Sequence, residues 1–444
     1  MQRSYSVVTS PVTGRFSTRY PALAGIPFIL DSRPGYHRLG SNYLIERGLG
    51  IWSPSIRIGG IPRIPTEKSI SNYAHWLSNF LEWADLRSID LSTCSYSVHI
   101  IGRYQSEMLQ GTWSTSGTPL MTSTVNSRVQ QACDFISWMV DKGIRGPFEV
   151  PYETRKLTLG SATGARGQLQ KEVRVRGGKV PRKPRCLHMP GSVSLRNWLK
   201  AVNDTAGEAR GLMCETILLT AMRREEVACL RIDTLPRNPI DWHVVNPEAP
   251  EHNQSVRIEI KFGTKGPNFG RDHGDKVGPT RAILIPLSLA KRWHAYRSGA
   301  RIKAFKRWMD GTPSHQTRAK RAEASVHLFL RENDGTRFKA KALYDAWRSV
   351  DLPVPGWCPH EGRHWWACSV LMRELRKQRH IFDLKGEATA AMLESTSISI
   401  IRMHIQPQLG HADDSTTMLY LTWALQQFSA PVCLDEELTL DITA

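Results

Sequence analysis

The stretch Leu409-Gly410-His411-Ala412-Asp413-Asp414-Ser415-Thr416-Thr417-Met418-Leu419-Tyr420 is the most informative part of this 444-residue chain. It places His411 nine positions before Tyr420, with a Ser-Thr-Thr run between them. The pattern of residues 415–428 predicts that Tyr420 lies in a helix. Taken alone, a tyrosine on such a helix is usually half-buried in a core. The block therefore acquires a functional meaning only together with the other polar motifs of the chain.

Three further motifs precede this block. Ala221-Met222-Arg223-Arg224-Glu225-Glu226-Val227 places an arginine at the start of a predicted helix. Gly263-Thr264-Lys265-Gly266 places a lysine in the polar segment between two predicted strands, 256–262 and 281–286. Pro359-His360-Glu361-Gly362-Arg363-His364 precedes an apolar helix. Each motif has an ordinary structural explanation, but their joint order is informative.

That order, Arg, Lys, His-x-x-Arg, Leu-Gly-His and then Tyr, resembles the tyrosine recombinase (phage integrase) family. The match lies in residues 221–227, 359–364 and 409–420, and the last block is the most specific of the three. The resemblance covers the predicted catalytic region in patches. It extends to a helical region over 65–154, which looks like the core-binding domain of the family, but not to residues 1–64.

The resemblance implies a role for each residue of these motifs. It assigns Tyr420 as the nucleophile and Lys265 as the acid for the leaving 5′ oxygen. It implies that His360 and His411 handle protons and donate hydrogen bonds to the phosphate, and that Glu226 orients the site. The chemistry agrees, because two planar, permanently charged guanidiniums can stabilise a phosphoryl transition state without a metal. Arg223 and Arg363 are the candidates for that pair.

Some departures from the family pattern leave alternatives open. Arg224 adjoins Arg223, and only the motif alignment favours Arg223. The connection between the predicted strands is long, so Lys261 and Lys276 are rivals of Lys265. The separation of Arg363 and His411 is larger than the family leads us to expect, which indicates an insertion around 376–403.

Three other functions compete with recombination. A type IB topoisomerase shares the Arg, Lys, Arg, His and Tyr chemistry, and a catalytically silent DNA-binding protein shares the fold. His360-Glu361-Gly362-Arg363-His364 also satisfies HExxH, the zinc-binding motif of metalloproteases. Pro359 and Gly362 weaken a helix through that motif, and no third-ligand motif surrounds Glu387. We therefore expect no metal and no cofactor.

The charge balance predicts a polyanionic partner. The chain has 59 Lys and Arg against 41 Asp and Glu, a formal net charge of +18. Such a surplus favours nucleic acid as the partner. The eight cysteines include no CxxC pair, no stretch of 18 apolar residues occurs and no secretory signal follows Met1. We expect reduced thiols, no membrane association and a cytoplasmic, nucleoid-associated protein.

Half of this surplus lies in residues 155–186, which contain ten lysines and arginines and one acid. Gly and Pro punctuate the segment, so we expect an extended, DNA-tracking linker between two domains. The expected DNA contacts are Arg174, Arg176, Lys179, Arg182, Lys183 and Arg185.

The sequence thus predicts a mainly α chain with a small β-hairpin, that is, an α+β fold of four segments. These are an N-terminal extension (1–64), a helical core-binding domain (65–154), the basic linker (155–186) and a catalytic domain with a C-terminal tail (187–444). The expected function is a site-specific recombinase or integrase of a mobile element, acting on double-stranded DNA through a 3′-phosphotyrosine. The resemblance implies a homotetramer on DNA, with other recombinases or accessory proteins as further partners. The sequence decides neither the target DNA nor the direction of the reaction.

Overall fold

The computed structural model describes residues 5–12, 14–31, 35–54, 64–158, 170–181, 187–264, 275, 277–312, 315–378, 387–410 and 418–428. The chain divides into two compact units, Met1–Pro184 and Arg185–Ala444. Within the described ranges, no helix is both long enough and apolar enough to span a bilayer.

The first unit is built on two long helices, α3 (Glu67–Leu86) and α5 (Thr122–Asp141). Thr66 caps α3 by accepting a hydrogen bond from the Ser69 amide. Apolar residues recur every three or four positions along each helix, and their side chains are buried together, apart from Tyr73 and Val140, which are half-buried. The Thr-Ser-Thr run at 122–124 predicts a Ser or Thr N-cap for α5, but the helix begins after Met121, which makes no side-chain cap hydrogen bond. Periodicity therefore predicted both helices but not the start of α5.

The N-terminal residues belong to the core of this unit. Strands β1 (Ser6–Thr9) and β2 (Pro27–Leu30) pair antiparallel, and α2 (Arg38–Leu49) packs on α3. Tyr43 of α2 is fully buried against the rings of Trp52, Phe135 and Trp138. The shorter helical elements of the unit are α1 (Arg15–Arg19), η1 (Pro21–Leu23), η2 (Tyr96–Gln105) and α4 (Ser106–Gln110).

A β-hairpin stands where the sequence led us to expect an extended linker. Strands β3 (Tyr152–Thr158) and β4 (Gln170–Arg176) pair antiparallel, with Lys156 opposite Glu172 in the register. The chain after β4 is held on the helices, because Asn126 exchanges two hydrogen bonds with the backbone of Val180, at 2.8 and 3.0 Å. This part of the basic segment is therefore ordered structure of the first unit.

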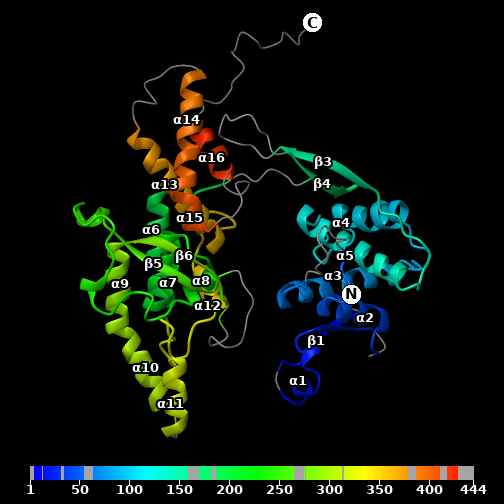
Figure 1. The fold of residues 1–444 in the computed structure, drawn as a ribbon, viewed down its shortest axis with the longest axis horizontal. Helices are drawn as coiled ribbons and strands as arrows, with labels where there is room; N and C mark the ends of the chain where they lie inside the picture. The colour runs from blue at the N-terminus through cyan, green and yellow to red at the C-terminus, as the bar shows by residue number, and fades with distance from the viewer. Residues whose placement is uncertain are drawn as a thin grey trace. The chain divides into compact units, whose positions relative to one another are not determined.

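The second unit surrounds one hairpin, β5 (Ser255–Phe262) with β6 (Val277–Pro286), as the alternation of apolar residues predicts. Helices α13 (Pro359–Lys377), α14 (Glu387–Ile400) and α16 (Met418–Phe428) lie together at one end of this unit, and α10 (Ala300–Asp310) and α11 (His315–Ala324) project from the other (Figure 1). The remaining elements are α6 (Ser192–Ala206), α7 (Glu208–Thr220), α8 (Arg224–Ala228), η3 (Pro239–Asp241), η4 (Glu251–Asn253), α9 (Leu287–Ser298), α12 (Ala340–Trp347), η6 (Ile401–Ile405) and α15 (Gln406–Leu409).

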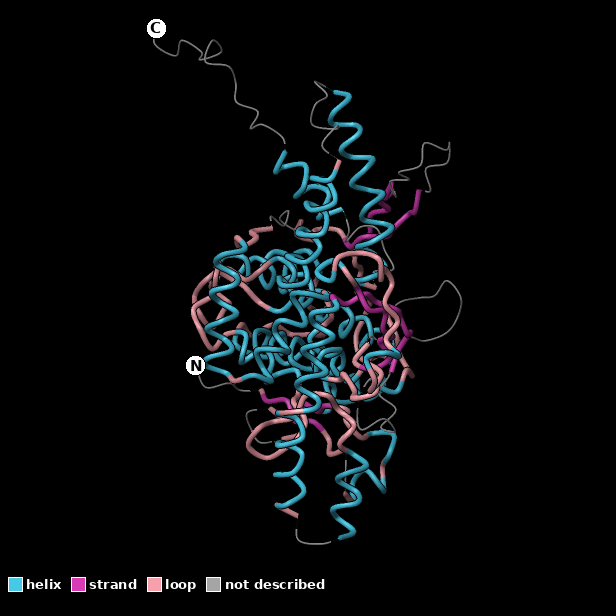
Figure 2. Tube along the Cα trace, turned by 90° about the vertical axis from the view of Figure 1, so that its left-hand side faces the viewer, coloured by secondary structure: helices cyan, strands magenta, loops and turns pink. Residues whose placement is uncertain are grey.

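Both units are mainly helical, and the strands among the described residues form short antiparallel pairs (Figure 2). The predicted α+β class is therefore confirmed. In the second unit, a large core around α7 and the hairpin adjoins a smaller one formed by α13, η6, α15 and α16. The smaller core contains Ala221 and Tyr420, so two motifs that lie far apart in the sequence meet there.

Candidate active site

Arg223 is placed by a tight turn between α7 and α8. Ala221 ends α7 in the left-handed conformation, with φ 55°, and Arg223 then caps α8. The Arg223 amide donates to Oε2 of Glu226 at 2.7 Å, and its Nη1 donates to Oε1 at 2.8 Å. Glu226 therefore fixes both the backbone and the side chain of Arg223.

Glu226 is fully buried and also binds an arginine of β6. Arg281 donates to both carboxylate oxygens, at 2.6 and 2.7 Å, and Arg363 Nη1 lies 3.9 Å from Oε2. Burial acts to raise the pKa of Glu226, but the hydrogen bonds and charges of Arg281 and Arg223 outweigh it and lower the pKa. The carboxyl group is thus ionised at neutral pH and balances part of the charge of three guanidiniums.

Arg363 lies in the first turns of α13 and is 4% exposed. It donates to the carbonyl oxygens of Ala221 and Leu409, the latter at 3.0 Å. Arg223 Nη2 donates to the same Leu409 oxygen at 3.3 Å and to the Gly410 oxygen at 3.3 Å. Burial, with the nearby charge of Arg223, lowers the pKa of Arg363 to about 10, which leaves it charged at neutral pH. Two guanidiniums from separate motifs therefore converge on one oxygen atom.

Gln408 fixes the backbone that presents this oxygen. Its amide nitrogen donates to the carbonyl oxygens of Thr220 (3.0 Å) and Leu284 (2.8 Å), and its oxygen accepts from the Leu284 amide at 2.9 Å. Gly410 follows with φ 62°, and a Cβ atom there would lie 2.9 Å from Cδ of Arg281. A glycine is required at this position both for the turn and for the close approach of Arg281.

Tyr420 is 1% exposed, and its hydroxyl lies 2.9 Å from Nδ1 of His364. His364 follows Arg363 on α13, so the histidine and one of the converging arginines are adjacent in the chain. The ring of His364 also packs edge-on against that of His360, with centroids 4.5 Å apart, and His360 is exposed. The tyrosine hydroxyl therefore has a potential proton acceptor within hydrogen-bond distance.

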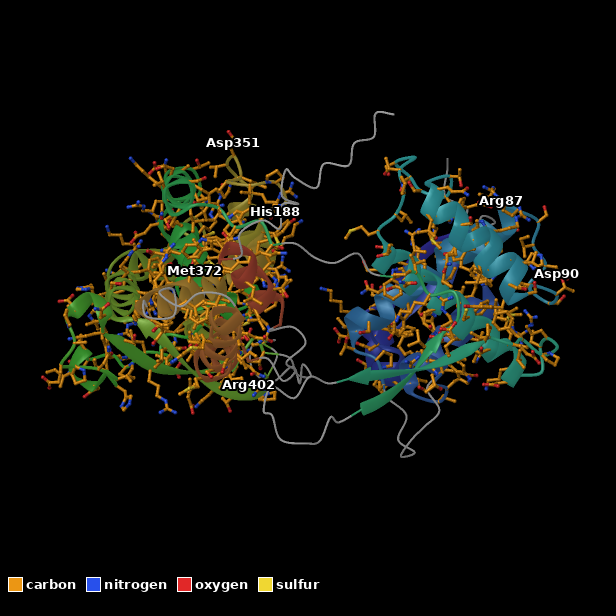
Figure 3. The ribbon with its side chains drawn as sticks, turned by 90° about the horizontal axis from the view of Figure 1, so that it is seen from above. Arg87, Asp90, His188, Asp351, Met372 and Arg402 are labelled. Carbon is orange, nitrogen blue, oxygen red and sulfur yellow. The ribbon has the colours of Figure 1, made fainter. Side chains whose placement is uncertain are left out.

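The structure brings together Arg223, Glu226, Arg363 and Tyr420, and it places His360 at the surface beside His364. Lys265 and His411 lie outside the described residues, as does Lys276. Lys261 is exposed on β5 and pairs with Glu259 at 3.1 Å. Met372 and Arg402, labelled in Figure 3, belong to α13 and η6 of the same unit.

The sequence motifs did not identify Arg281, His364 and Gln408 as members of this cluster. His364 stands inside a motif already recognised, and its position one residue after Arg363 was the available signal. Arg281 begins a predicted apolar strand, where a charged residue is a weak indication of a buried pair. Gln408 carries no signal, because only the folded backbone shows which carbonyl groups it binds.

Pro359 and Gly362, which the sequence led us to regard as weakening a helix through the HExxH motif, do not interrupt it. Pro359 takes the first position of α13, where its missing N–H costs no hydrogen bond, and the helix continues through Gly362. Gly362 lies against Trp347, since a Cβ atom there would be 2.6 Å from the ring. Across the described part of the chain, no group of three or more His, Cys, Asp or Glu side chains is arranged to hold a metal ion.

Arg176 differs from its expected role as a DNA contact. It is 4% exposed, and its guanidinium donates to the hydroxyl of Tyr96 at 2.5 Å, so it joins β4 to η2. Lys179 is exposed. The side chain of Arg174 and all of Arg182, Lys183 and Arg185 lie outside what the structure describes.

No family model matches this chain, and no curated protein matches it. Several solved structures are similar to it at low identity. The XerH site-specific recombinase bound to palindromic difH substrate has a TM-score of 0.41 and 17% identity, over 81% of this chain and 77% of that one. The Tn1549 transposon integrase in complex with transposon right end DNA has a TM-score of 0.46 and 13% identity, over 88% and 97%. The XerA recombinase has a TM-score of 0.30 and 14% identity, over 82% and 93%.

Proposed function

We propose that the second unit is the catalytic unit of a site-specific DNA recombinase, which cuts and rejoins duplex DNA through a 3′-phosphotyrosine. The observation that carries this proposal is that Arg223 and Arg363 both donate to the Leu409 carbonyl oxygen. The hydroxyl of Tyr420 lies within hydrogen-bond distance of His364, the residue after Arg363. The planar N–H donors of an arginine guanidinium bind phosphate oxygens as well as carbonyl oxygens. A DNA phosphate would accept from the same donors.

The arginine cluster provides fixed positive charge without a metal ion. Three guanidiniums face one carboxylate, that of Glu226, so the cluster keeps a net positive charge. Donors held in place before the reaction stabilise charge developing on the non-bridging oxygens at no cost of reorganisation. Glu226 and Arg281 are positioning residues in this scheme, because Glu226 holds Arg223 and Arg281 holds Glu226.

In the first chemical step, the phosphorus at the 3′ end of the cut strand exchanges its bond to the 5′ oxygen for a bond to the Tyr420 oxygen. The Tyr420 oxygen attacks phosphorus, and its proton passes to Nδ1 of His364. The bond from phosphorus to the 5′ oxygen breaks, and Lys265 donates a proton to that oxygen. The phosphotyrosine ester conserves the free energy of the broken phosphodiester bond, so a 5′-hydroxyl of another strand can attack phosphorus, displace Tyr420 and rejoin the DNA without ATP. His360 and His411 serve as hydrogen-bond donors to the phosphate.

Double-stranded DNA is the partner that the net charge of +18 favours. Exchange between two duplexes requires four cleavages, so a homotetramer on DNA is the proposed working assembly. A mobile element with its own accessory proteins or a second recombinase is the proposed setting. Such a protein acts beside the chromosome, in the nucleoid.

A nicked suicide duplex tests the proposal. The nick lies close to the cleavage position, so that cleavage releases a short fragment carrying the 5′-hydroxyl. This fragment diffuses away, rejoining cannot occur, and the covalent adduct accumulates. We expect the wild-type chain to form an adduct on duplexes from the ends of the element that encodes it, and Tyr420→Phe to form none. Tyr344→Phe, which removes an exposed hydroxyl of α12, is the matched control.

An adduct on Tyr420→Phe would show that another residue is the nucleophile. Relaxation of a supercoiled plasmid that lacks the element's ends would instead favour a topoisomerase. Sequence-independent binding with no adduct on any duplex would favour a silent DNA-binding protein.

A further inference from the structure

Helices α10 and α11, which we call the basic arm, carry a strong positive charge. They project from one end of the second unit, whereas α13, α14 and α16 lie together at the other (Figure 1). The two helices contain seven lysines and arginines and two acids, Asp310 and Glu323. The arginine cluster takes its side chains from α8, β6 and α13 and none from the arm. The chemistry proposed above therefore leaves the charge of the arm without a role.

The base of the arm is fixed to the body of the unit. Arg301 is 8% exposed, and its guanidinium donates to the carbonyl oxygens of His327 at 3.0 Å and Ser325 at 2.7 Å. The backbone at Gly335 packs directly on α10, since a Cβ atom there would lie 2.4 Å from the Ala304 carbonyl oxygen. Helix α10 therefore holds its exposed positions in place before any partner binds.

Three lysines of the arm are exposed and, within the described part of the chain, have no acid partner. They are Lys303 and Lys306 of α10 and Lys320 of α11. Lys303, Lys306 and Arg307 stand at positions i, i+3 and i+4, so three like charges share one face of α10. Arg307 donates to the Glu332 carbonyl oxygen, which is a neutral acceptor. Like charges at these spacings destabilise a helix, so this face is unfavourable unless an anion binds it.

Helix α11 contributes almost nothing to the core of the unit. Its described side chains are exposed, apart from Arg321, which is half-buried. Arg318 and Arg321 attach the helix to the end of α10, through the carbonyl oxygens of Thr312 at 3.2 Å and Trp308 at 3.3 Å. A helix without a buried apolar face gains little stability from packing, so the fold of the unit does not explain α11. A partner that binds the arm gives this basic helix a role.

We propose that the basic arm is a second DNA-binding surface, which contacts phosphates of the duplex away from the cleavage position. This rests on the proposed function, in which the arginine cluster binds the phosphate that is cut. Lysine contacts to phosphates add affinity without reading the bases. Helix α10 has 11 residues and is about 16 Å long, and one base pair adds about 3.4 Å to a duplex. The exposed face of α10 therefore spans about five base pairs.

A salt series of fluorescence anisotropy on one long duplex tests the arm without any cleavage. The double variant Lys303→Gln/Lys306→Gln removes two charges from α10 and keeps good helix formers. We expect the slope of log K against log salt to fall by about 1.8, because each phosphate contact contributes about 0.9. Adding Lys320→Gln should lower the slope by about a further 0.9. The melting temperature should not fall, because the change relieves repulsion between like charges.

The double variant Lys291→Gln/Lys377→Gln is the matched control. It also removes two exposed lysines of the second unit, but each of these already pairs with a carboxylate, that of Glu251 at 2.5 Å or that of Glu374 at 2.9 Å. The formal charge of the chain changes by the same amount in both double variants. The control should therefore keep the wild-type salt slope, because its lysines have a counter-charge within the chain.

Hydroxyl-radical footprinting of the covalent adduct then locates the contact. The phosphotyrosine marks the cleavage position, so the protected positions can be counted from it. We expect the wild-type adduct to protect about five base pairs that lie away from the cleavage position, which is the length of the α10 face. Lys303→Gln/Lys306→Gln should lose this protection and keep the protection at the cleavage position.

A wild-type slope in the arm variants, in chains that circular dichroism shows to be folded, would overturn the proposal. So would equal losses in the arm and control variants, which would indicate an effect of net charge alone, or an unchanged footprint. Arm variants that alter the oligomeric state in sedimentation, with an unchanged slope, would assign the arm to an acidic protein instead. If the slope depends on the arm but the wild-type chain forms no adduct on any duplex, the proposed function fails and the arm remains a DNA-binding surface.

Discussion

Both carboxylate oxygens of Glu226 accept hydrogen bonds from Arg281, at 2.6 and 2.7 Å, although the two residues lie 55 positions apart in the chain. The same carboxylate orients Arg223 and lies 3.9 Å from Arg363. One buried acid therefore sets the relative positions of three arginines from α8, β6 and α13. This makes Glu226 the residue on which the geometry of the arginine cluster depends most.

Replacing the acid should destabilise the second unit. We expect Glu226→Gln to lower the free energy of unfolding by about 3 kcal/mol, because three guanidiniums lose their buried counter-charge. Thermal unfolding followed by circular dichroism measures the effect. Glu225→Gln makes the same chemical change on the exposed neighbour, which pairs with Arg224 at 3.9 Å, and should change stability by less than about 0.5 kcal/mol. Equal losses in the two variants would contradict the role assigned to Glu226.

The loss of stability that Glu226→Gln causes relative to the wild type should depend on pH with a definite sign. The arginines lower the pKa of Glu226 in the folded chain, so its contribution to stability is full above its ordinary pKa and is lost as the pH falls through the lowered value. The stability difference between wild type and Glu226→Gln should therefore be constant near neutral pH and shrink below about pH 4. A difference that grows towards acid would have the wrong sign.

His364 should be required for proton transfer from Tyr420. Asparagine can place its side-chain oxygen near the position of Nδ1, so His364→Asn keeps a hydrogen-bond acceptor but cannot take up a proton. We expect adduct formation on the nicked duplex to slow by about 100-fold, with DNA affinity unchanged. His404→Asn changes an exposed histidine of η6 and should have wild-type rates. A His364→Asn variant as fast as wild type would reduce His364 to a packing partner of Tyr420.

The long helices and the β5–β6 hairpin could be predicted, because their apolar periods match the faces that become buried. The place of the N-terminal residues in the core of the first unit could not be predicted from the sequence, because α2 has little amphipathic pattern. Tyr43 is recognisable as a core residue only in the folded chain, where the rings of Trp52 and Trp138 pack against it. The hairpin β3–β4 was missed because high positive charge is typical of a linker, whereas strand pairing depends on the partner strand.

The candidate site was predictable only to the extent that its chemistry lies in local motifs. Arg223, Arg363 and Tyr420 belong to such motifs, and the structure brings them into one region. Arg281 reaches Glu226 because the register of β6 against β5 places it there, and no local pattern encodes that distance. His364 contacts Tyr420 because α13 and α16 pack together, which is again a tertiary contact.

Arg176 and Lys179 should give opposite results in DNA binding and stability. Arg176 is buried against Tyr96, so we expect Arg176→Ala to cost the first unit about 1–3 kcal/mol and to leave the salt dependence of DNA affinity unchanged. Lys179 is exposed, so Lys179→Ala should leave stability unchanged and, if it contacts a phosphate, reduce the slope of log K against log salt by about 0.9. Fluorescence anisotropy over a salt series measures the slope. The reverse pattern would show that Arg176, and not Lys179, faces the DNA.

Gly362 should be intolerant of the smallest possible side chain. Its Cβ position is 2.6 Å from Cη2 of Trp347, a fully buried ring that has no room to retreat. Alanine favours helices, yet Gly362→Ala should destabilise the chain by about 1–3 kcal/mol, because α13 must shift to relieve the clash. Gly311→Ala, whose Cβ would meet its nearest atom at an ordinary 3.5 Å, is the matched control and should be close to neutral. Because Arg363 is the next residue, the shift of α13 should also slow adduct formation by more than the loss of folded protein explains. An unchanged rate per folded molecule would show that the arginine cluster tolerates movement of α13.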